Sequence, residues 1–189
     1  LIPAALVSNG AGFVQVDENG KYYNAAETDA FLEAMNWVMG MVSKYEMKAP
    51  EGAEWNYFES AFINGEVALQ VHEDYFAGSL SNMEDDYGFV FFPKGPRATT
   101  YLYAPSDNIM VIPACYDADR AWKIAFAYNL FTNPTPGYTD SDDWKNGYYQ
   151  KYRDERAVDE TITMMREPEH QFVWYSDMVT GYDLGSQYI

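Results

Sequence analysis

Apolar residues recur every three or four positions in the first third of the chain, the spacing that one face of an α-helix produces. In the first such stretch these residues are Phe31, Met35, Val38, Met39 and Val42. Asn24 stands three residues before Glu27, as in a capping box, so we predict a helix over residues 25–47 that ends before Pro50. Ahead of this helix, the turn signal at 17–20 lies between two short apolar stretches and predicts a β-hairpin.

The middle of the chain changes from helical spacing to alternation. Trp55 and two phenylalanines that follow it at helical spacing predict a second helix, which stops at Asn64-Gly65, a C-cap signal. Alternating apolar residues then predict three strands, at 66–72, 86–92 and 108–112. A short helix over 73–83 is predicted between the first two strands.

Two further helices are predicted in the second half. Asp117 can cap a helix that continues to Phe131 and is apolar around most of its surface. We therefore expect this helix to be well buried, with Trp122 in the core. Residues 155–166 have one apolar face and predict another helix. Helices that alternate with strands indicate an α/β or α+β fold.

Composition narrows the possible partners. The 189 residues fit one large domain or two small ones. They include 12 Lys and Arg against 29 Asp and Glu, and the formal charge of −17 disfavours nucleic acid and anionic membrane surfaces. Apolar residues reach 48%, which argues against disorder. Aromatic residues reach 17%, which leaves two interpretations, an aromatic-rich core or a surface on which flat ligands stack.

Few catalytic or cofactor signatures are present. The single Cys115 excludes a disulfide within the chain and a multi-cysteine zinc site. Only His72 and His170 occur, so a histidine-based zinc site would need carboxylates to complete it. Glycine-rich nucleotide fingerprints and the Gly-x-Ser-x-Gly elbow are missing, and we predict no cofactor, no metal and no catalysis. No apolar run is long enough to span a membrane, and the start without Met leads us to expect a piece of a longer protein.

The cluster His72-Glu73-Asp74-Tyr75 directly follows a predicted strand, where α/β sheets place ligand-binding residues. Three interpretations stay open. Glu73 and Asp74 could be the acid and base of a glycosidase, although neighbours in sequence rarely face each other across the required gap of about 5–10 Å. The loop could instead be solvated, with Tyr75 packed on the sheet. In the third interpretation the carboxylates accept hydrogen bonds from sugar hydroxyls or pair with a cationic ligand, while Tyr75 offers a ring face.

Four segments carry a family signature when they are taken in order. The first is FESAFINGEVALQ at 58–70, and a glycine-rich hairpin, GAGF followed by DENGKY, precedes it at 10–22. YGFVFFPKGP lies at 87–96, and a strand-like segment at 107–114 is followed by DRAWKIA at 119–125. Together they resemble bacterial extracellular solute-binding proteins of the carbohydrate-binding group, maltose-binding proteins included. The resemblance covers about residues 6–132.

The resemblance implies an α/β fold, a periplasmic-binding-protein-like type II lobe with a central mixed sheet flanked by helices. Residues 1–132 would form the C-terminal ligand-binding lobe of a two-lobed protein. Residues 133–189 would form a helical or irregular segment that packs on the lobe or the hinge. The implied function is capture of a solute, a carbohydrate in this group, by hinge closure and its delivery to an ABC permease. The implied partners are that ligand, the permease and an N-terminal lobe that precedes residue 1.

The same resemblance implies a location and a set of ligand contacts. The location is extracellular, as a cell-surface lipoprotein or a periplasmic protein. Six residues are expected to contact the ligand: Trp55, Tyr75, Glu73, Asp74, Asp107 and Asn9. Tyr75 lies where the family often has a tryptophan that stacks on a sugar ring, and Glu73-Asp74 replace the usual Gly-Pro before it. Trp55 lies at an aromatic contact where the second helix starts, and the other two residues lie in loops that face the cleft.

Two alternatives from other functional classes stay open. One is a glycosidase-like enzyme domain that uses Glu73 or Asp74. The other is a surface interaction module without a small-molecule site. Turnover that depends on Glu73 would distinguish the first, and a structure without cleft-facing aromatic residues would favour the second.

Overall fold

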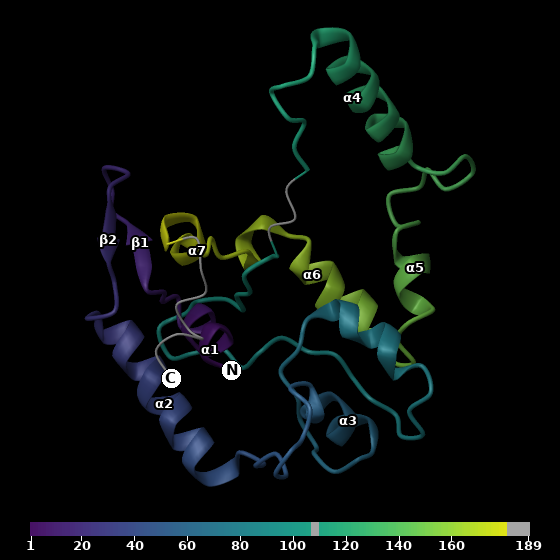
Figure 1. The fold of residues 1–189 in the computed structure, drawn as a ribbon. Helices are drawn as coiled ribbons and strands as arrows, with labels where there is room; N and C mark the ends of the chain where they lie inside the picture. The colour runs from purple at the N-terminus through teal and green to yellow at the C-terminus, as the bar shows by residue number, and fades with distance from the viewer. Residues whose placement is uncertain (107–109, 181–189) are drawn as a thin grey trace. The chain divides into compact units, whose positions relative to one another are not determined.

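The structure is a computed structural model that describes residues 1–106 and 110–180 (Figure 1). The described residues fall into two compact units. The first comprises Leu1–Pro105 together with the described chain from Tyr149 onward, and the second comprises Ser106–Tyr148. The predicted division of the chain at residue 132 stays a prediction.

Helices are the main elements of both units. The first unit begins with α1 (Ile2–Ser8), β1 (Val14–Val16), β2 (Tyr22–Asn24), α2 (Asp29–Tyr45), α3 (Tyr57–Ile63) and the 3₁₀-helix η1 (Asp74–Leu80). It ends with the π-helix η2 (Ala157–Ile162), α6 (Thr163–Met165), the 3₁₀-helix η3 (Pro168–His170) and α7 (Tyr175–Thr180). The second unit contains α4 (Ala118–Thr132), and α5 (Lys145–Tyr149) reaches the boundary between the units.

The predicted α/β fold class, a type II binding-protein lobe with a central mixed sheet, was wrong. The structure is 43% helical, and the described residues form a single two-stranded antiparallel sheet. The predicted strands at 66–72 and 86–92 are absent, and their residues Leu69 and Val90 are exposed. Of the third predicted strand, 110–112 has no regular structure and 108–109 lies outside the described residues.

The missing strands have a physical reason. Alternation gives a segment one apolar face, but a strand forms only when a neighbouring backbone pairs with its N–H and C=O groups. Within the described part of the chain, the only ladder is the β1–β2 pair, and Tyr103 and Gln171 add one isolated parallel bridge. Residues 67–72 and 86–92 therefore have the pattern of strands without the partners.

The predicted hairpin is confirmed. Val14 pairs with Asn24 and Val16 with Tyr22 in an antiparallel register. The Asp17 carboxylate accepts the backbone N–H groups of Asn19 and Lys21, each at 2.9 Å, and Gly20 takes a positive φ of 77° that favours glycine. The turn residues thus determine the register locally.

The helix predicted over 25–47 is confirmed as α2, but its predicted cap was wrong. Thr28 has an extended backbone and is the N-cap, because its hydroxyl accepts the N–H of Phe31 at 3.4 Å. The Asn24 side chain instead accepts the N–H of Ala26 at 3.0 Å, a local turn contact directly after β2. Asn24 therefore stabilises a turn ahead of the helix, and the N-cap is Thr28, four residues later than the capping box predicted.

Other predicted helices are confirmed with changed geometry. The second helix is α3, and Gly65 follows it with a positive φ of 71°. The short helix predicted over 73–83 is the 3₁₀-helix η1. The helix predicted over 155–166 consists of η2 and α6, and its side chains Val158 and Ile162 are buried as the apolar face requires.

The helix that Asp117 caps is confirmed as α4, but its predicted burial was wrong. The Asp117 carboxylate accepts the N–H of Arg120 at 2.8 Å. No residue of α4 is buried, and Trp122, predicted to lie in the core, is 61% exposed and stacks on Phe126 at 5.1 Å. Burial needs a second layer of structure, and the unit Ser106–Tyr148 provides none for this helix.

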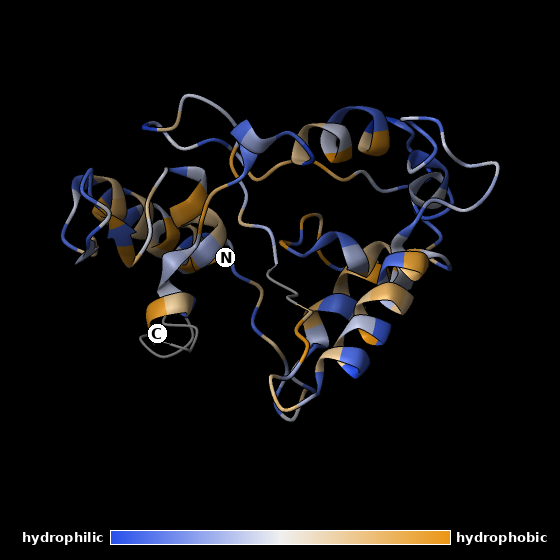
Figure 2. Ribbon diagram, turned by 90° about the horizontal axis from the view of Figure 1, so that it is seen from above, coloured by the Kyte–Doolittle hydropathy of each residue, from blue (hydrophilic) through white to orange (hydrophobic). Residues whose placement is uncertain are grey.

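The core of the first unit lies where α1 packs against α2 (Figure 1). Leu6 is fully buried there, against Phe31 and Val38 of α2. Phe13, just before the hairpin, contacts Phe31 edge-on at 5.0 Å and Trp174 at 6.1 Å. Figure 2 shows helices that carry both polar and apolar residues, as expected when one face packs and the other meets solvent.

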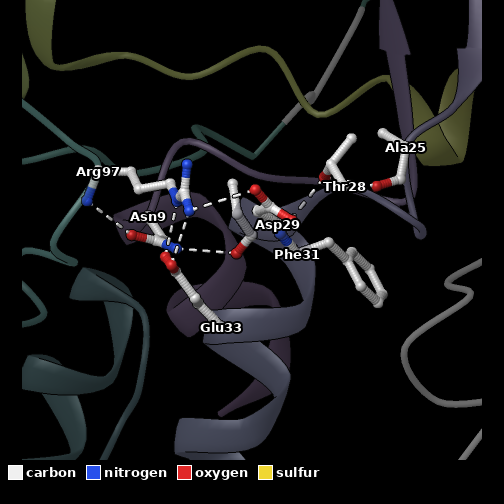
Figure 3. Close-up of polar contacts among 8 residues, drawn as sticks. Asn9, Ala25, Thr28, Asp29, Phe31, Glu33 and Arg97 are labelled. Carbon is white, nitrogen blue, oxygen red and sulfur yellow. Dashed lines mark hydrogen bonds and ion pairs between the residues drawn. The ribbon is translucent and has the colours of Figure 1, made fainter.

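The Asn9 side chain joins three segments next to this core (Figure 3). Asn9 is 3% exposed, and its amide donates to the carbonyl oxygen of Ala30 in α2 at 2.8 Å. The amide oxygen accepts the backbone N–H of Arg97 at 3.0 Å. Gly95 passes so closely that an added Cβ would lie 2.8 Å from the Asn9 Cα, so only glycine fits there. A buried amide with both ends satisfied therefore connects α1, α2 and the segment around residue 97.

We predict that Asn9→Ala lowers the free energy of unfolding by about 1–3 kcal/mol, because it leaves two backbone groups without their partner. Chemical denaturation at equilibrium measures this loss. The control is Asn36→Ala on the exposed side of α2, which removes the same amide and should change stability only slightly. Equal effects of the two substitutions would contradict the role assigned to Asn9.

Candidate functional site

The predicted cluster at 72–75 lies where the chain enters η1. Glu73 is the N-cap residue of this helix and is exposed, and Asp74 begins the helix. Tyr75 is 63% exposed. Within the described part of the chain, neither the Glu73 nor the Asp74 carboxylate is paired with a cation. The cluster thus presents one aromatic ring and two unpaired carboxylates on a single short segment.

His72 holds this segment in place. Its ring stacks on Phe76 at 4.2 Å between centroids and meets Tyr75 edge-on at 5.3 Å. The N–H of Glu73 donates to His72 Nδ1 at 2.9 Å, so this nitrogen carries a lone pair and Nε2 carries the proton. Nε2 then donates to Glu59 Oε1 of α3 at 3.3 Å. Both ring nitrogens are occupied, and the ring supports Tyr75 from one side.

Trp55 lies just before α3 in the first unit. It is 87% exposed, the exposure of a side chain that packs on almost nothing. In α3 the Tyr57 hydroxyl donates to Glu66 Oε2 at 3.0 Å, and this bond to a carboxylate raises the pKa of Tyr57. Helix α3 is therefore tied both to the chain that follows it and, through Glu59, to the loop that carries Tyr75.

The remaining two predicted site residues do not join this segment. Asn9 is buried between α1 and α2, where its amide bonds the backbone of Ala30 and Arg97 and also the side chain of Glu33. Asp107 lies outside the described residues. The structure thus places Glu73, Asp74 and Tyr75 side by side in the loop and Trp55 at the start of α3. That these residues contact a ligand stays a prediction.

Two adjoining open depressions lie elsewhere in the first unit, and none of the predicted site residues lines them. The larger has a volume of about 700 Å³ and is lined by Asp86, Tyr87, Gly88, Arg153, Asp154, Glu155 and Arg156. The smaller has a volume of about 460 Å³ and shares Tyr87, Arg153 and Glu155 with it. The charged run at 153–156 is the sequence signal for this region.

The polar groups of these depressions are mostly used within the chain. Arg153 donates to the carbonyl oxygens of Met83 and Asp85, the latter at 3.1 Å. Tyr87 donates to the carbonyl oxygen of Lys151, and burial raises its pKa. The Arg156 guanidinium bonds the Asp154 carboxylate and lowers the pKa of that group. These contacts hold 83–87 against 151–156 and leave few groups for a ligand.

A third cluster joins a buried histidine to two exposed glutamates. His170 is 5% exposed, and its Nδ1 lies 2.8 Å from the carbonyl oxygen of Tyr101 and 3.1 Å from the Thr100 hydroxyl. Its Nε2 faces Glu167 Oε2 at 3.5 Å and Glu169 Oε1 at 3.9 Å. One ligand atom from each of the three residues lies within 4.8 Å of the others. Sequence analysis noted that a histidine site would need carboxylates but did not identify these two.

An ion pair between Arg97 and Glu33 lies beside Asn9 (Figure 3). Arg97 Nε and a terminal guanidinium nitrogen each donate to one oxygen of Glu33 at 2.7 Å, and Asp29 lies 3.6 Å away. The hydrogen bonds from Arg97 lower the pKa of Glu33, and the carboxylate raises the pKa of Arg97. The bidentate geometry fixes both side chains at the start of α2. Both oxygens of the Glu33 carboxylate are therefore engaged by Arg97.

Comparison with known proteins adds no relative. No family model, no curated protein and no solved structure matches this chain. Among the described residues, no helix has both the length and the apolar character needed to cross a membrane. The functional assignment therefore rests on the geometry above and on the resemblance of the four segments.

The lowered pKa of Glu33 makes one contribution to stability dependent on pH. Because the folded-state pKa is below the unfolded value of about 4.3, the contribution is present above that value. It is lost as the pH falls through the folded-state pKa. We predict that Glu33→Gln lowers the thermal midpoint at pH 7 and that its difference from the unmodified protein shrinks as the pH falls below the unfolded value of about 4.3.

Thermal unfolding followed by circular dichroism across this pH range measures the effect. Glu18→Gln in the hairpin turn is the control, because Glu18 is exposed and has no arginine partner. Its midpoint should follow that of the unmodified protein at every pH. A Glu33→Gln difference that stays constant from pH 7 to pH 3 would contradict the assignment.

Proposed function

We propose that this chain is part of a protein that captures a carbohydrate outside the cell and delivers it to an ABC permease. The observation that carries the proposal is the exposed ring of Tyr75, which His72 supports and which follows Glu73 and Asp74, two carboxylates without a cationic partner among the described residues. The resemblance of the four segments to carbohydrate-binding solute receptors supports the same class. No catalytic step is proposed.

The chemistry of the segment suits a sugar. A pyranose has an apolar face of C–H groups that packs on an aromatic ring, and a rim of hydroxyls that donate hydrogen bonds. Tyr75 and Trp55 offer ring faces that are largely free of other contacts, since they are 63% and 87% exposed. Glu73 and Asp74 can accept from the hydroxyls of a sugar on Tyr75, or pair with an amino sugar.

The proposed mechanism is closure around the ligand. A single exposed segment contacts a sugar on one side only, and most small-molecule sites bury the greater part of their ligand. A second lobe of the same protein, which the resemblance places before residue 1, would supply the opposite wall. The ligand would then favour the closed state because it contacts both walls only there.

No specific observation among the described residues favours the glycosidase alternative. Glu73 and Asp74 are adjacent in sequence at the start of one short helix, whereas glycosidases need two carboxyl groups on opposite sides of the bond, about 5–10 Å apart. The proposal therefore assigns both carboxylates to binding.

Titration calorimetry of the full-length protein that carries this chain, with a panel of mono- and oligosaccharides, tests the proposal. We predict one binding site per chain for at least one sugar. Tyr75→Ala and Trp55→Ala should each weaken binding about tenfold or more, since about 1.4 kcal/mol of lost contact corresponds to that factor. The matched control is Tyr45→Ala, an equally exposed tyrosine at the end of α2, which should leave the affinity unchanged.

Two results would contradict the proposal. One is tight binding of a peptide with no binding of any sugar in the panel. The other is turnover of a glycoside that Glu73→Gln abolishes, which would make the protein an enzyme. If Tyr45→Ala and Tyr75→Ala weaken sugar binding equally, Tyr75 is not a ligand contact.

A further inference from the structure

Three groups that accept hydrogen bonds converge on one point beside η3. They are the Nε2 atom of His170 and one carboxylate oxygen each from Glu167 and Glu169, all within 4.8 Å of one another. The cluster lies apart in sequence from the segment assigned to carbohydrate binding, and no part of the proposed function uses it. Its geometry determines what can sit between the three atoms.

The hydrogen bonds on the far side of the His170 ring fix its tautomer. Nδ1 lies 2.8 Å from the carbonyl oxygen of Tyr101, and a carbonyl oxygen can only accept. Nδ1 therefore carries a proton, and in the neutral ring Nε2 carries the lone pair. Metal-binding histidines typically donate their second ring nitrogen to a backbone carbonyl in this way, which orients the ring and strengthens the ligand.

His72 provides a contrast within the same chain. Its Nδ1 accepts a backbone N–H, and its Nε2 donates to Glu59 at 3.3 Å. Both of its nitrogens are therefore engaged in ordinary hydrogen bonds. For His170 Nε2, by contrast, the described residues provide no hydrogen-bond donor, only two carboxylates.

The distances at His170 suit a bridging cation. A direct N–H···O hydrogen bond spans about 2.7–3.2 Å, whereas Nε2 lies 3.5 Å from Glu167 and 3.9 Å from Glu169. Zinc bonds to nitrogen and oxygen are about 2.0–2.2 Å long, which separates two ligands of a tetrahedral site by about 3.3–3.6 Å. The Glu167 distance falls in this range, and Glu169 lies slightly farther out on an exposed side chain.

Burial makes the arrangement costly without a positive charge. His170 is 5% exposed and its ring lies 5.7 Å from the Phe91 ring, so little of the imidazole meets solvent. A lone pair and two negative charges that face each other there repel, and a cation between them turns the repulsion into attraction. Backbone hydrogen bonds hold His170 in place. Its carbonyl oxygen accepts the N–H of Tyr103 at 3.0 Å, and its own N–H donates to the backbone carbonyl oxygen of Glu167 at 3.1 Å.

We propose that Glu167, Glu169 and His170 bind one divalent transition-metal cation, with zinc as the ion that best fits one imidazole and two carboxylates. Three protein ligands leave the solvent side of the ion open to water. The bound ion connects η3 to residues 100–103 through the Tyr101 and Thr100 contacts of the His170 ring. It stabilises this part of the first unit and has no assigned role in carbohydrate binding.

The test uses the full-length protein that carries this chain, freed of metal with a chelator and titrated with zinc in a calorimeter. We expect one tight site per chain and an increase of the thermal midpoint when zinc is added. Cobalt in the same site should give the intense visible absorption of a four-coordinate ion. The double variant Glu167→Gln, Glu169→Gln should lose at least about a hundredfold in zinc affinity, which is about 2.8 kcal/mol at 1.4 kcal/mol per factor of ten.

A matched control separates this site from general attraction to an acidic protein. The variant Glu51→Gln, Glu54→Gln removes the same two charges from exposed positions and should bind zinc like the unmodified protein. All substituted glutamates are exposed, so the variants should keep the fold, as circular dichroism can verify. Equal zinc affinity of the two double variants, or no stoichiometric binding to the unmodified protein, would overturn the proposal.

Discussion

The buried amide of Asn9 is the contact on which the arrangement of the first unit depends. It donates to Ala30 in α2 and accepts from the backbone of Arg97, so segments that are distant in sequence meet at one side chain. Because the amide is buried, neither bond can be replaced by water at low cost. The same contact brings Arg97 to the N-terminal half of α2, where its guanidinium meets Glu33. The packing of α1 on α2 and the ion pair at their edge both depend on this polar residue.

The elements that sequence analysis predicted correctly are those with local causes. The hairpin follows from Asp17 and Gly20, and α4 begins where Asp117 can cap it. The central sheet could not be predicted from alternation, because alternation describes one strand and pairing requires another. The predicted burial of Trp122 was wrong for a related reason, since an apolar helix is buried only where a second layer of structure packs on it. Asn9 was expected to face a ligand, but it binds a backbone 88 residues away, a distance at which local patterns carry no information.

The two candidate sites differ in the same way. The loop with Glu73 and Tyr75 was recognised because its residues are consecutive, and the structure adds the ring of His72 that supports Tyr75. The cluster at His170 was missed because its tautomer depends on the carbonyl oxygen of Tyr101, which is 69 residues away in sequence. Only that distant bond shows that His170 Nε2 carries a lone pair facing Glu167 and Glu169. Each site thus combines a local run of residues with a support that the fold provides.

The central claim is that two exposed aromatic rings, that of Tyr75 beside Glu73 and Asp74 and that of Trp55 before α3, bind a carbohydrate. A crystal structure of the full-length protein with the sugar that it binds most tightly tests this most directly. We predict a sugar ring in van der Waals contact with the face of Tyr75 or Trp55, and a hydroxyl of that sugar donating to Glu73 or Asp74. A sugar bound elsewhere, with both aromatic rings facing solvent, would contradict the claim.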